Sequence, residues 1–179
     1  MNILRVLVML IAGFGLVACE SSSTEPTNDY GYNVKAFRIR PHMVDDIRER
    51  HLETINSVRF SQGLPALEYA PALDAAALRQ AESINVQQRA WHFGQDGSSP
   101  LDRIQQAGFT GPLIGENVSE TFEDDQVTLQ AWLRDPNSRS VILDPNARYV
   151  GLAWSQEGNA KLWWVQVVGG AGATILASN

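Results

Sequence analysis

The stretch Trp91-His92-Phe93-Gly94-Gln95-Asp96-Gly97-Ser98-Ser99-Pro100-Leu101-Asp102-Arg103 decides the fold of this chain, together with two shorter stretches that follow it. These are Gly115-Glu116-Asn117 and then Ala131-Trp132-Leu133-Arg134-Asp135-Pro136-Asn137-Ser138-Arg139. In chain order, the three stretches contain an imidazole (His92), a carboxylate (Glu116) and a hydroxyl (Ser138). Their combination is more specific than any one of them alone.

Turn and cap chemistry accounts for most of the first stretch. Asp96-Gly97 is a turn pair, and Ser99-Pro100 is typical of a helix start in which the serine is the N-cap. Asp102 and Arg103 lie in the first turn of the short helix that follows. We therefore expect them to act as cap and salt-bridge residues rather than as catalytic ones.

Two longer helices are predicted before this stretch. Apolar residues at spacings of three and four from Met43 onward indicate an amphipathic helix that ends at Gly63, and a second helix begins at Pro71. His51 falls on the apolar stripe of the first helix, where a packed, hydrogen-bonded histidine is more common than a ligand. We expect His51 in or beside the core.

Strand and helix patterns alternate after Gly115. The segment Val118 to Phe122 indicates a strand, Asp135-Pro136 ends a helix that starts near residue 124, and Asn137 or Ser138 is expected to cap a further short helix. The clearest strands are residues 149–155 and 161–169, which predict an antiparallel hairpin. Helices interleaved with a few strands predict an α+β domain in which helices cover a small sheet.

In order and spacing, the three stretches resemble the CAP or SCP-like domain (cysteine-rich secretory protein, antigen 5, pathogenesis-related 1) in its bacterial secreted form. Asn56-Ser57-Val58-Arg59 and Trp163 to Gly169 are similar to the first helix and the last core strand of that family, so the resemblance covers about residues 43–169. It implies a three-layer α-β-α sandwich with a small, mainly antiparallel sheet. We expect this domain over residues 41–172, with a tail at residues 173–179.

The resemblance also implies a polar cleft. Its ligand-binding residues are, by motif, His92, Glu116, Asn117 and Ser138, although Ser138 stands where secreted bacterial members usually carry a histidine. In some members the cleft holds a divalent metal, for which His92 and Glu116 are the candidate ligands here. A zinc site needs at least three protein ligands and the motifs supply two, so we predict no cofactor and keep zinc as an alternative.

Two other interpretations of these residues stay open. Glu116 and His92 can be purely structural, with the carboxylate bonded to loop amides and the imidazole packed beside Trp91. Alternatively, Ser138, His92 and Glu116 are the residue types of a nucleophile, a base and an orienting acid. The sequence contains no Gly-x-Ser-x-Gly elbow, His-Glu-x-x-His motif, phosphate loop or dinucleotide fingerprint.

The amino terminus resembles a bacterial lipoprotein signal. Arg5 precedes a 12-residue apolar run, Val6 to Val17, which is too short to span a bilayer and suits the core of a signal peptide. Leu16-Val17-Ala18-Cys19 is similar to the lipoprotein cleavage box, which implies a signal peptide at residues 1–18 and lipid on Cys19. An ordinary signal peptide, or a short anchor with an incidental cysteine, is the alternative.

Lipid on Cys19 predicts a protein held on the extracytoplasmic side of a bacterial envelope membrane, with residues 19–40 as the lipidated cysteine and a polar, flexible linker. Cys19 is the only cysteine, so no disulfide is expected, and the remaining length suits one domain. The formal charge is −6, and −7 without residues 1–18, which disfavours nucleic acid as a partner.

The sequence thus predicts a membrane-tethered, CAP-like lipoprotein that acts as a non-enzymatic binding or envelope-associated module. By family resemblance its ligand is a lipid, a sterol-like molecule or an envelope protein, and the membrane itself is a partner through Cys19. The alternative function is a cleft-based hydrolase that uses His92 and Glu116 with Ser138 or a divalent metal.

Overall fold

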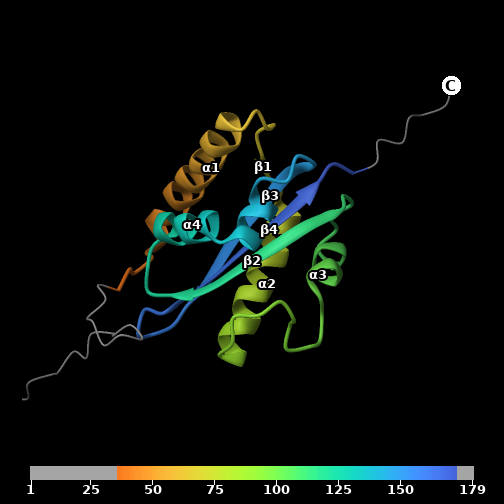
Figure 1. Ribbon diagram of the computed structural model, residues 1–179. Coiled ribbons are helices and arrows are strands. Elements are labelled where there is room, and N and C mark those ends of the chain that lie inside the picture. The colour runs from red at the N-terminus through yellow and green to blue at the C-terminus, as the bar shows by residue number, and fades with distance from the viewer. Residues whose placement is uncertain (1–35, 173–179) are drawn as a thin grey trace, which may run out of the picture.

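The computed structural model describes residues 36–172 (Figure 1). The elements are, in chain order, η1 (Pro41–Met43), α1 (Val44–Ser61), β1 (Glu68–Tyr69), α2 (Pro71–Gln87), α3 (Pro100–Gln106), β2 (Leu113–Thr121), α4 (Asp125–Arg134), α5 (Pro136–Ile142), β3 (Ala147–Gln156) and β4 (Leu162–Gly170). The strands form a four-stranded sheet in the order β1-β3-β4-β2. Strand β4 pairs antiparallel with both β3 and β2, whereas the short β1 is parallel to β3.

Helices cover both faces of this sheet, so the predicted three-layer sandwich with a mainly antiparallel sheet is confirmed. Helices α1, α4 and α5 pack on one face, and α2 and α3 pack on the other (Figure 1). The two clusters of buried apolar side chains lie on opposite sides of β4, because successive side chains of a strand point to opposite faces. Trp164 belongs to the first cluster and Trp163 to the second.

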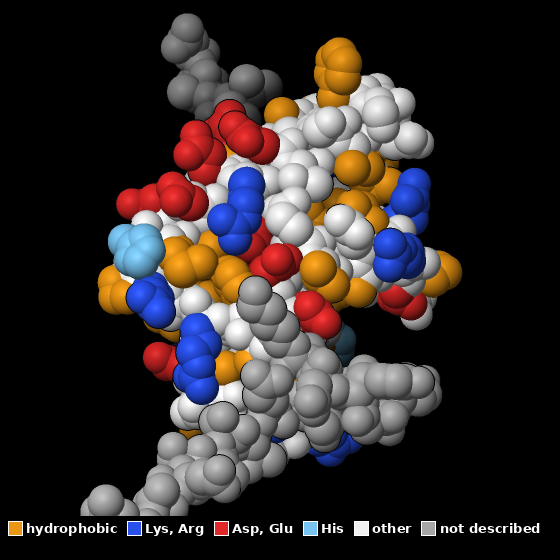
Figure 2. Space-filling view, turned by 90° about the vertical axis from the view of Figure 1, so that its left-hand side faces the viewer, with side chains coloured by type: hydrophobic (Ala, Val, Ile, Leu, Met, Phe, Trp, Pro, Cys, Tyr) orange, Lys and Arg blue, Asp and Glu red, His pale blue; other side chains and the backbone are white. Residues whose placement is uncertain are grey.

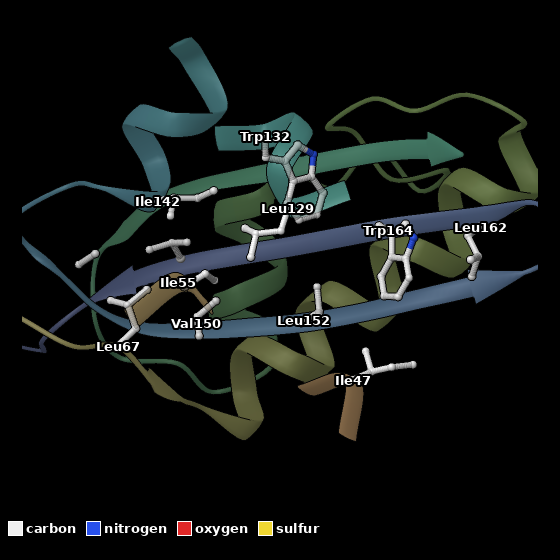
Figure 3. Packing of buried hydrophobic residues seen from close by; sticks show 12 residues of the cluster. Ile47, Ile55, Leu67, Leu129, Trp132, Ile142, Val150, Leu152, Leu162 and Trp164 are labelled. Carbon is white, nitrogen blue, oxygen red and sulfur yellow. The ribbon is translucent and has the colours of Figure 1, made fainter. Parts of the chain in front are cut away.

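Strand β4 is the centre of the fold. All nine of its residues are buried, which explains why its sequence is almost continuously apolar rather than alternating. Figure 3 shows the buried cluster on one side of this strand. Trp164 and Leu162 of β4 and Leu152 of β3 belong to it, together with Leu129 and Trp132 of α4. The hairpin predicted at residues 149–155 and 161–169 is confirmed, and each strand is slightly longer than predicted or shifted by one residue at its ends.

The helix ends show which cap predictions hold. Ser99 caps α3 in a reciprocal capping box with Asp102, as the sequence predicts. The predicted cap of α5 is wrong, because Asp135, and neither Asn137 nor Ser138, is its N-cap, with Pro136 as the first helical residue. Phe122 lies just outside β2.

In the motif Asn56-Ser57-Val58-Arg59 on α1, Asn56 and Arg59 form hydrogen bonds with the backbone of other segments. The Asn56 side chain forms two hydrogen bonds with the backbone of Leu67, at 2.7 and 3.0 Å. Arg59 is fully buried, and its guanidinium donates to the carbonyl oxygens of Pro65, Ile142, Asp144 and Ala147. This one side chain therefore joins the loop after α1 to the turn that leads from α5 into β3.

Strand β1 pairs with only part of the outer edge of β3, and side chains cover the edge beyond it. The Leu152 N–H donates to Asp74 Oδ1 at 2.9 Å, and Arg48 Nη2 donates to the Leu152 carbonyl at 3.2 Å. Arg48 and Asp74 also form an ion pair at 2.7 Å. Together they satisfy the backbone groups that a neighbouring strand would otherwise bond.

Several sequence-based expectations fall outside the described residues. These are the signal peptide at residues 1–18, lipid on Cys19, most of the linker and the tail at residues 173–179. Among the helices of residues 36–172, none combines the length and apolar composition that crossing a membrane requires. On the face shown in Figure 2, acidic, basic and hydrophobic side chains are interspersed, with several acidic ones gathered at one end.

Candidate functional site

One pocket, of about 290 Å³, is lined by all four predicted cleft residues, His92, Glu116, Asn117 and Ser138. Glu116 and Asn117 lie on β2, which is an edge strand of the sheet. His92 comes from the loop between α2 and α3, and Ser138 comes from α5, so the pocket lies where both helical layers meet this edge. The remaining lining residues, which the sequence did not predict, are Val118, Asp135, Asn137 and Val141.

Gly115 lets α5 approach β2 closely at this point. A Cβ atom added to Gly115 would lie 2.6 Å from Val141 Cγ2, well inside van der Waals contact. Any larger residue would push α5, which carries Ser138, away from the strand that carries Glu116. The glycine of the Gly-Glu-Asn motif is therefore required by packing of the pocket wall.

Glu116 is the most constrained carboxylate of the site. Its side chain is only 1% exposed, Oε2 accepts from Arg103 Nη2 at 2.7 Å, and Oε1 accepts from His92 Nδ1 at 3.0 Å. Arg103 is equally buried and also donates to the carbonyl oxygens of Ser98 and His92. The salt-bridge role predicted for Arg103 is confirmed, and Glu116 is bonded to a guanidinium and an imidazole rather than to loop amides.

His92 differs from Glu116 in its exposure, since 52% of its side chain is accessible to solvent. Its Nδ1–H is directed to Glu116, which fixes the orientation of the ring. Among the interactions of residues 36–172, no hydrogen bond involves His92 Nε2, so this nitrogen is available to a molecule in the pocket.

Ser138 is held by the helix start and is not paired with His92. Its amide donates to Asp135 Oδ2 at 2.8 Å. The amide and the hydroxyl of Ser138 together keep the pKa of Asp135 below its ordinary value. Within the described part of the chain no hydrogen bond joins Ser138 to His92, and such a bond is the defining contact of a serine nucleophile with its base.

The residues present do not fit a zinc ion. Both oxygens of Glu116 are already engaged, one of them by the positive charge of Arg103. Residues 36–172 contain no group of three or more histidine, cysteine or acidic side chains arranged to hold a metal. Asp135, the further carboxylate of the pocket, is committed to capping α5.

Asn117 joins the pocket to a buried polar chain in the core. Its Nδ2 donates to Gln166 Oε1 at 3.0 Å and to the Ser138 carbonyl at 3.3 Å. Gln166 Nε2 in turn donates to His51 Nε2 at 2.9 Å, and the His51 ring stands edge-on to Trp132. His51 is fully buried, which confirms its predicted place in the core.

Acid is expected to destabilise the fold through His51. Burial, with a smaller effect of the Arg50 charge, lowers the pKa of His51 to about 3 from 6.5. Between these values the unfolded chain binds a proton that the folded chain does not, so stability is lost as the pH falls below 6.5. The expected loss from this residue at pH 5 is about 2 kcal/mol.

Urea unfolding at pH 7.5 and pH 5 measures this loss, and His51→Gln is the control because glutamine does not titrate. The free energy of unfolding should fall more between the two pH values for the native chain than for His51→Gln. Equal falls in the two proteins would show that His51 is not the titrating group.

The sequence model of the cysteine-rich secretory protein family, CAP, matches residues 52–168, which is well over half of the chain. The chain belongs to the CAP family. The match lies inside the segment, residues 43–169, over which the motifs predicted this resemblance. The motif residues that line the pocket are thus residues of a CAP domain.

Several individual proteins are similar to this chain at low sequence identity. An outer surface protein of Borrelia burgdorferi has 18% identity and a TM-score of 0.65, covering 75% of this chain and 98% of that one. An extracellular SCP-domain protein of Bacillus anthracis has 20% identity and a TM-score of 0.58, covering 74% of this chain and 45% of that one. Among curated proteins, the uncharacterized YkwD of Bacillus subtilis is 24% identical over 129 residues, 72% of this chain. The chain spans about half or less of the length of the curated relatives it matches.

Proposed function

We propose that this protein is a lipid-anchored, extracytoplasmic CAP-domain module that binds a lipid or an envelope protein through the pocket of His92 and Glu116, without catalysing a reaction. The single observation that carries the proposal is the state of Glu116, whose two oxygens are held by Arg103 and His92. A carboxylate neutralised in this way organises the pocket wall and leaves His92 Nε2 as a group for binding.

The contacts of Ser138 support binding rather than hydrolysis. A hydrolytic serine needs a base within about 2.6–3.2 Å of its hydroxyl. The Ser138 amide instead donates to Asp135 Oδ2 at the start of α5, and within residues 36–172 no hydrogen bond joins the Ser138 hydroxyl to His92. The same observation makes Ser138 a positioned part of the wall, in contact with any molecule that enters.

The size and lining of the pocket suit part of a larger ligand. At about 290 Å³ it lies at the lower end of small-molecule sites, and Val118 and Val141 provide apolar surface beside the polar groups. A lipid head group with the start of its chain fits this description, and so does one inserted side chain of a protein. His92 Nε2 supplies a polar contact to either.

The extracytoplasmic location rests on the amino terminus and on the relatives. The run Val6 to Val17 and the box that ends at Cys19 have the features of a lipoprotein signal. The similar proteins include one named as an outer surface protein and one named as extracellular. Mass spectrometry of the amino-terminal peptide tests the anchor, since we expect it to begin at Cys19 and to carry fatty acyl groups.

Photo-crosslinking in cells tests the binding function. A benzophenone amino acid at Asn137, on the rim of the pocket, should give a lipid or protein adduct, whereas the same group at Phe60, which is 84% exposed and outside the pocket, should not. His92→Ala should lower the yield of the adduct about tenfold, the effect of losing one good hydrogen bond. His42→Ala is the matched control, because His42 is exposed on η1.

Two outcomes would overturn the proposal. One is an adduct at Asn137 that His92→Ala and His42→Ala reduce equally. The other is esterase or peptidase activity of the full chain that Ser138→Ala abolishes or that depends on added zinc.

A further inference from the structure

The pocket of His92 and Glu116 offers a ligand mainly acceptors of hydrogen bonds. The neutral His92 ring donates its Nδ1–H to Glu116, so Nε2 carries the free lone pair, and about half of this side chain is accessible to solvent. Asp135 lines the same pocket, is exposed, and has a carboxylate that only accepts. Asn137 and Ser138, which also line the pocket, can donate or accept. A ligand group that bonds to His92 Nε2 or to Asp135 must therefore be a donor.

The charge of the lining is negative. Its two carboxylates belong to Glu116 and Asp135, and none of its lining residues within the described part of the chain is a lysine or an arginine. Arg103 neutralises Glu116, whereas no ion pair joins Asp135 to another described residue. The amide and the hydroxyl of Ser138 keep the pKa of Asp135 below its ordinary value, so Asp135 is ionised at neutral pH. Among donors of hydrogen bonds, the pocket therefore favours a cation.

A primary ammonium group matches both properties. It carries three N–H donors, no acceptor and a compact positive charge. A trimethylated nitrogen has the same charge but no N–H, so it cannot bond to His92 Nε2. Val118 and Val141 provide apolar surface in the same pocket, which suits the methylene groups beside such a nitrogen.

The charges beside the pocket distinguish a lipid head group from a lysine side chain. Arg134 directly precedes Asp135, and Arg139 follows it by one turn of α5. Both arginines are exposed, and neither forms an ion pair with another described residue. In an ethanolamine phospholipid, a phosphate lies a short carbon link away from the ammonium, and guanidinium groups bind phosphate well. Negative charge in the pocket with positive charge beside it therefore favours this zwitterion over a lysine.

We propose that the pocket binds the primary ammonium of an ethanolamine phospholipid head group. This inference rests on the proposed function and names the ligand of the same site. The ammonium donates to His92 Nε2 and to the carboxylate of Asp135. The phosphate stays outside the pocket, on the side of Arg139.

Two soluble head groups test this proposal on the native full chain in a maltoside detergent. The probes are glycerophosphoethanolamine and glycerophosphocholine, which differ only in the three methyl groups on nitrogen. NMR of the imidazole ¹⁵N signals follows each titration at about pH 8, which lies above the ordinary pKa of imidazole and below that of an alkylammonium. We expect the His92 signals to move with glycerophosphoethanolamine, and glycerophosphocholine to bind at least about tenfold more weakly.

Asp135→Asn tests the carboxylate, because asparagine is also a good N-cap and keeps the start of α5. This variant should bind glycerophosphoethanolamine at least about tenfold more weakly than the native chain. Asp124→Asn is the matched control and should leave binding unchanged, since Asp124 caps α4 in the same way and does not line the pocket. If Asp135→Asn does not fold, the comparison of the two probes on the native chain decides the matter.

Three results would overturn this proposal. They are equal binding of the two probes or binding of neither, equal effects of Asp135→Asn and Asp124→Asn, and tighter binding of N-acetyl-lysine methylamide than of glycerophosphoethanolamine. The last result would indicate a lysine of a protein partner. A crosslinked adduct at Asn137 that depends on His92, without any preference between the probes, would leave the proposed function standing and overturn only this inference.

Discussion

Replacing Arg103 by methionine is expected to lower the free energy of unfolding by about 3–5 kcal/mol, because it leaves the buried Glu116 carboxylate without its cation. The Glu116 side chain is 1% exposed, so water does not replace the lost partner. The variant also leaves the carbonyl oxygens of Ser98 and His92 without their donor. Urea unfolding at neutral pH, followed by tryptophan fluorescence, measures the change.

Arg79→Met is the matched control for this prediction. Its ion pair with Asp96 is about half exposed on both sides, and exposed pairs contribute less than about 1 kcal/mol. If Arg103→Met and Arg79→Met were equally stable, the interpretation of Arg103 as the counter-ion of Glu116 would be wrong. Adding Glu116→Gln to Arg103→Met should recover part of the lost stability, since it removes the unpaired charge.

Arg59→Met is expected to cost a similar amount, about 3–5 kcal/mol, because four main-chain carbonyl oxygens lose a charged donor at once. One of these carbonyls belongs to Ile142, the last residue of α5, so the cation also meets the negative end of that helix. The loss should appear in urea unfolding and should loosen α5, the helix that carries Ser138.

Arg89→Met provides the comparison for Arg59. Arg89 is exposed and its guanidinium lies over the Trp91 ring at 4.2 Å, a contact that contributes about 1 kcal/mol or less. Hydrogen exchange of the α5 amides separates a local effect from a global one. Unchanged exchange in α5 would contradict the role assigned to Arg59.

Local chemistry made much of the fold predictable. Ser99 before Pro100 and the strand pattern of residues 149–155 depend on neighbours in the chain, and the structure agrees with both. The convergence of three distant stretches on one pocket follows from their resemblance to a family. Pattern alone carries no such long-range information.

The details of the site depend on tertiary packing, which the sequence pattern does not contain. Arg103 and Glu116 lie on different elements, and no periodicity links them, so their pairing follows only from the way α3 meets β2. The sequence predicts Asp135 as the end of a helix, although an acidic residue before proline is also a typical helix start. Gln80 lies on a helix whose other buried residues are apolar, and only the structure shows that its Nε2 donates to the Trp91 carbonyl.

The ion pair of Arg48 and Asp74 on the β3 edge is expected to affect how copies of this domain associate when they are crowded. An open strand edge is a template on which another chain adds a strand, and here two side chains occupy that place at Leu152. Burial raises the pKa of Asp74, so acid weakens this guard by protonating the carboxylate. Acid conditions should therefore promote edge-to-edge self-association of molecules that are still folded.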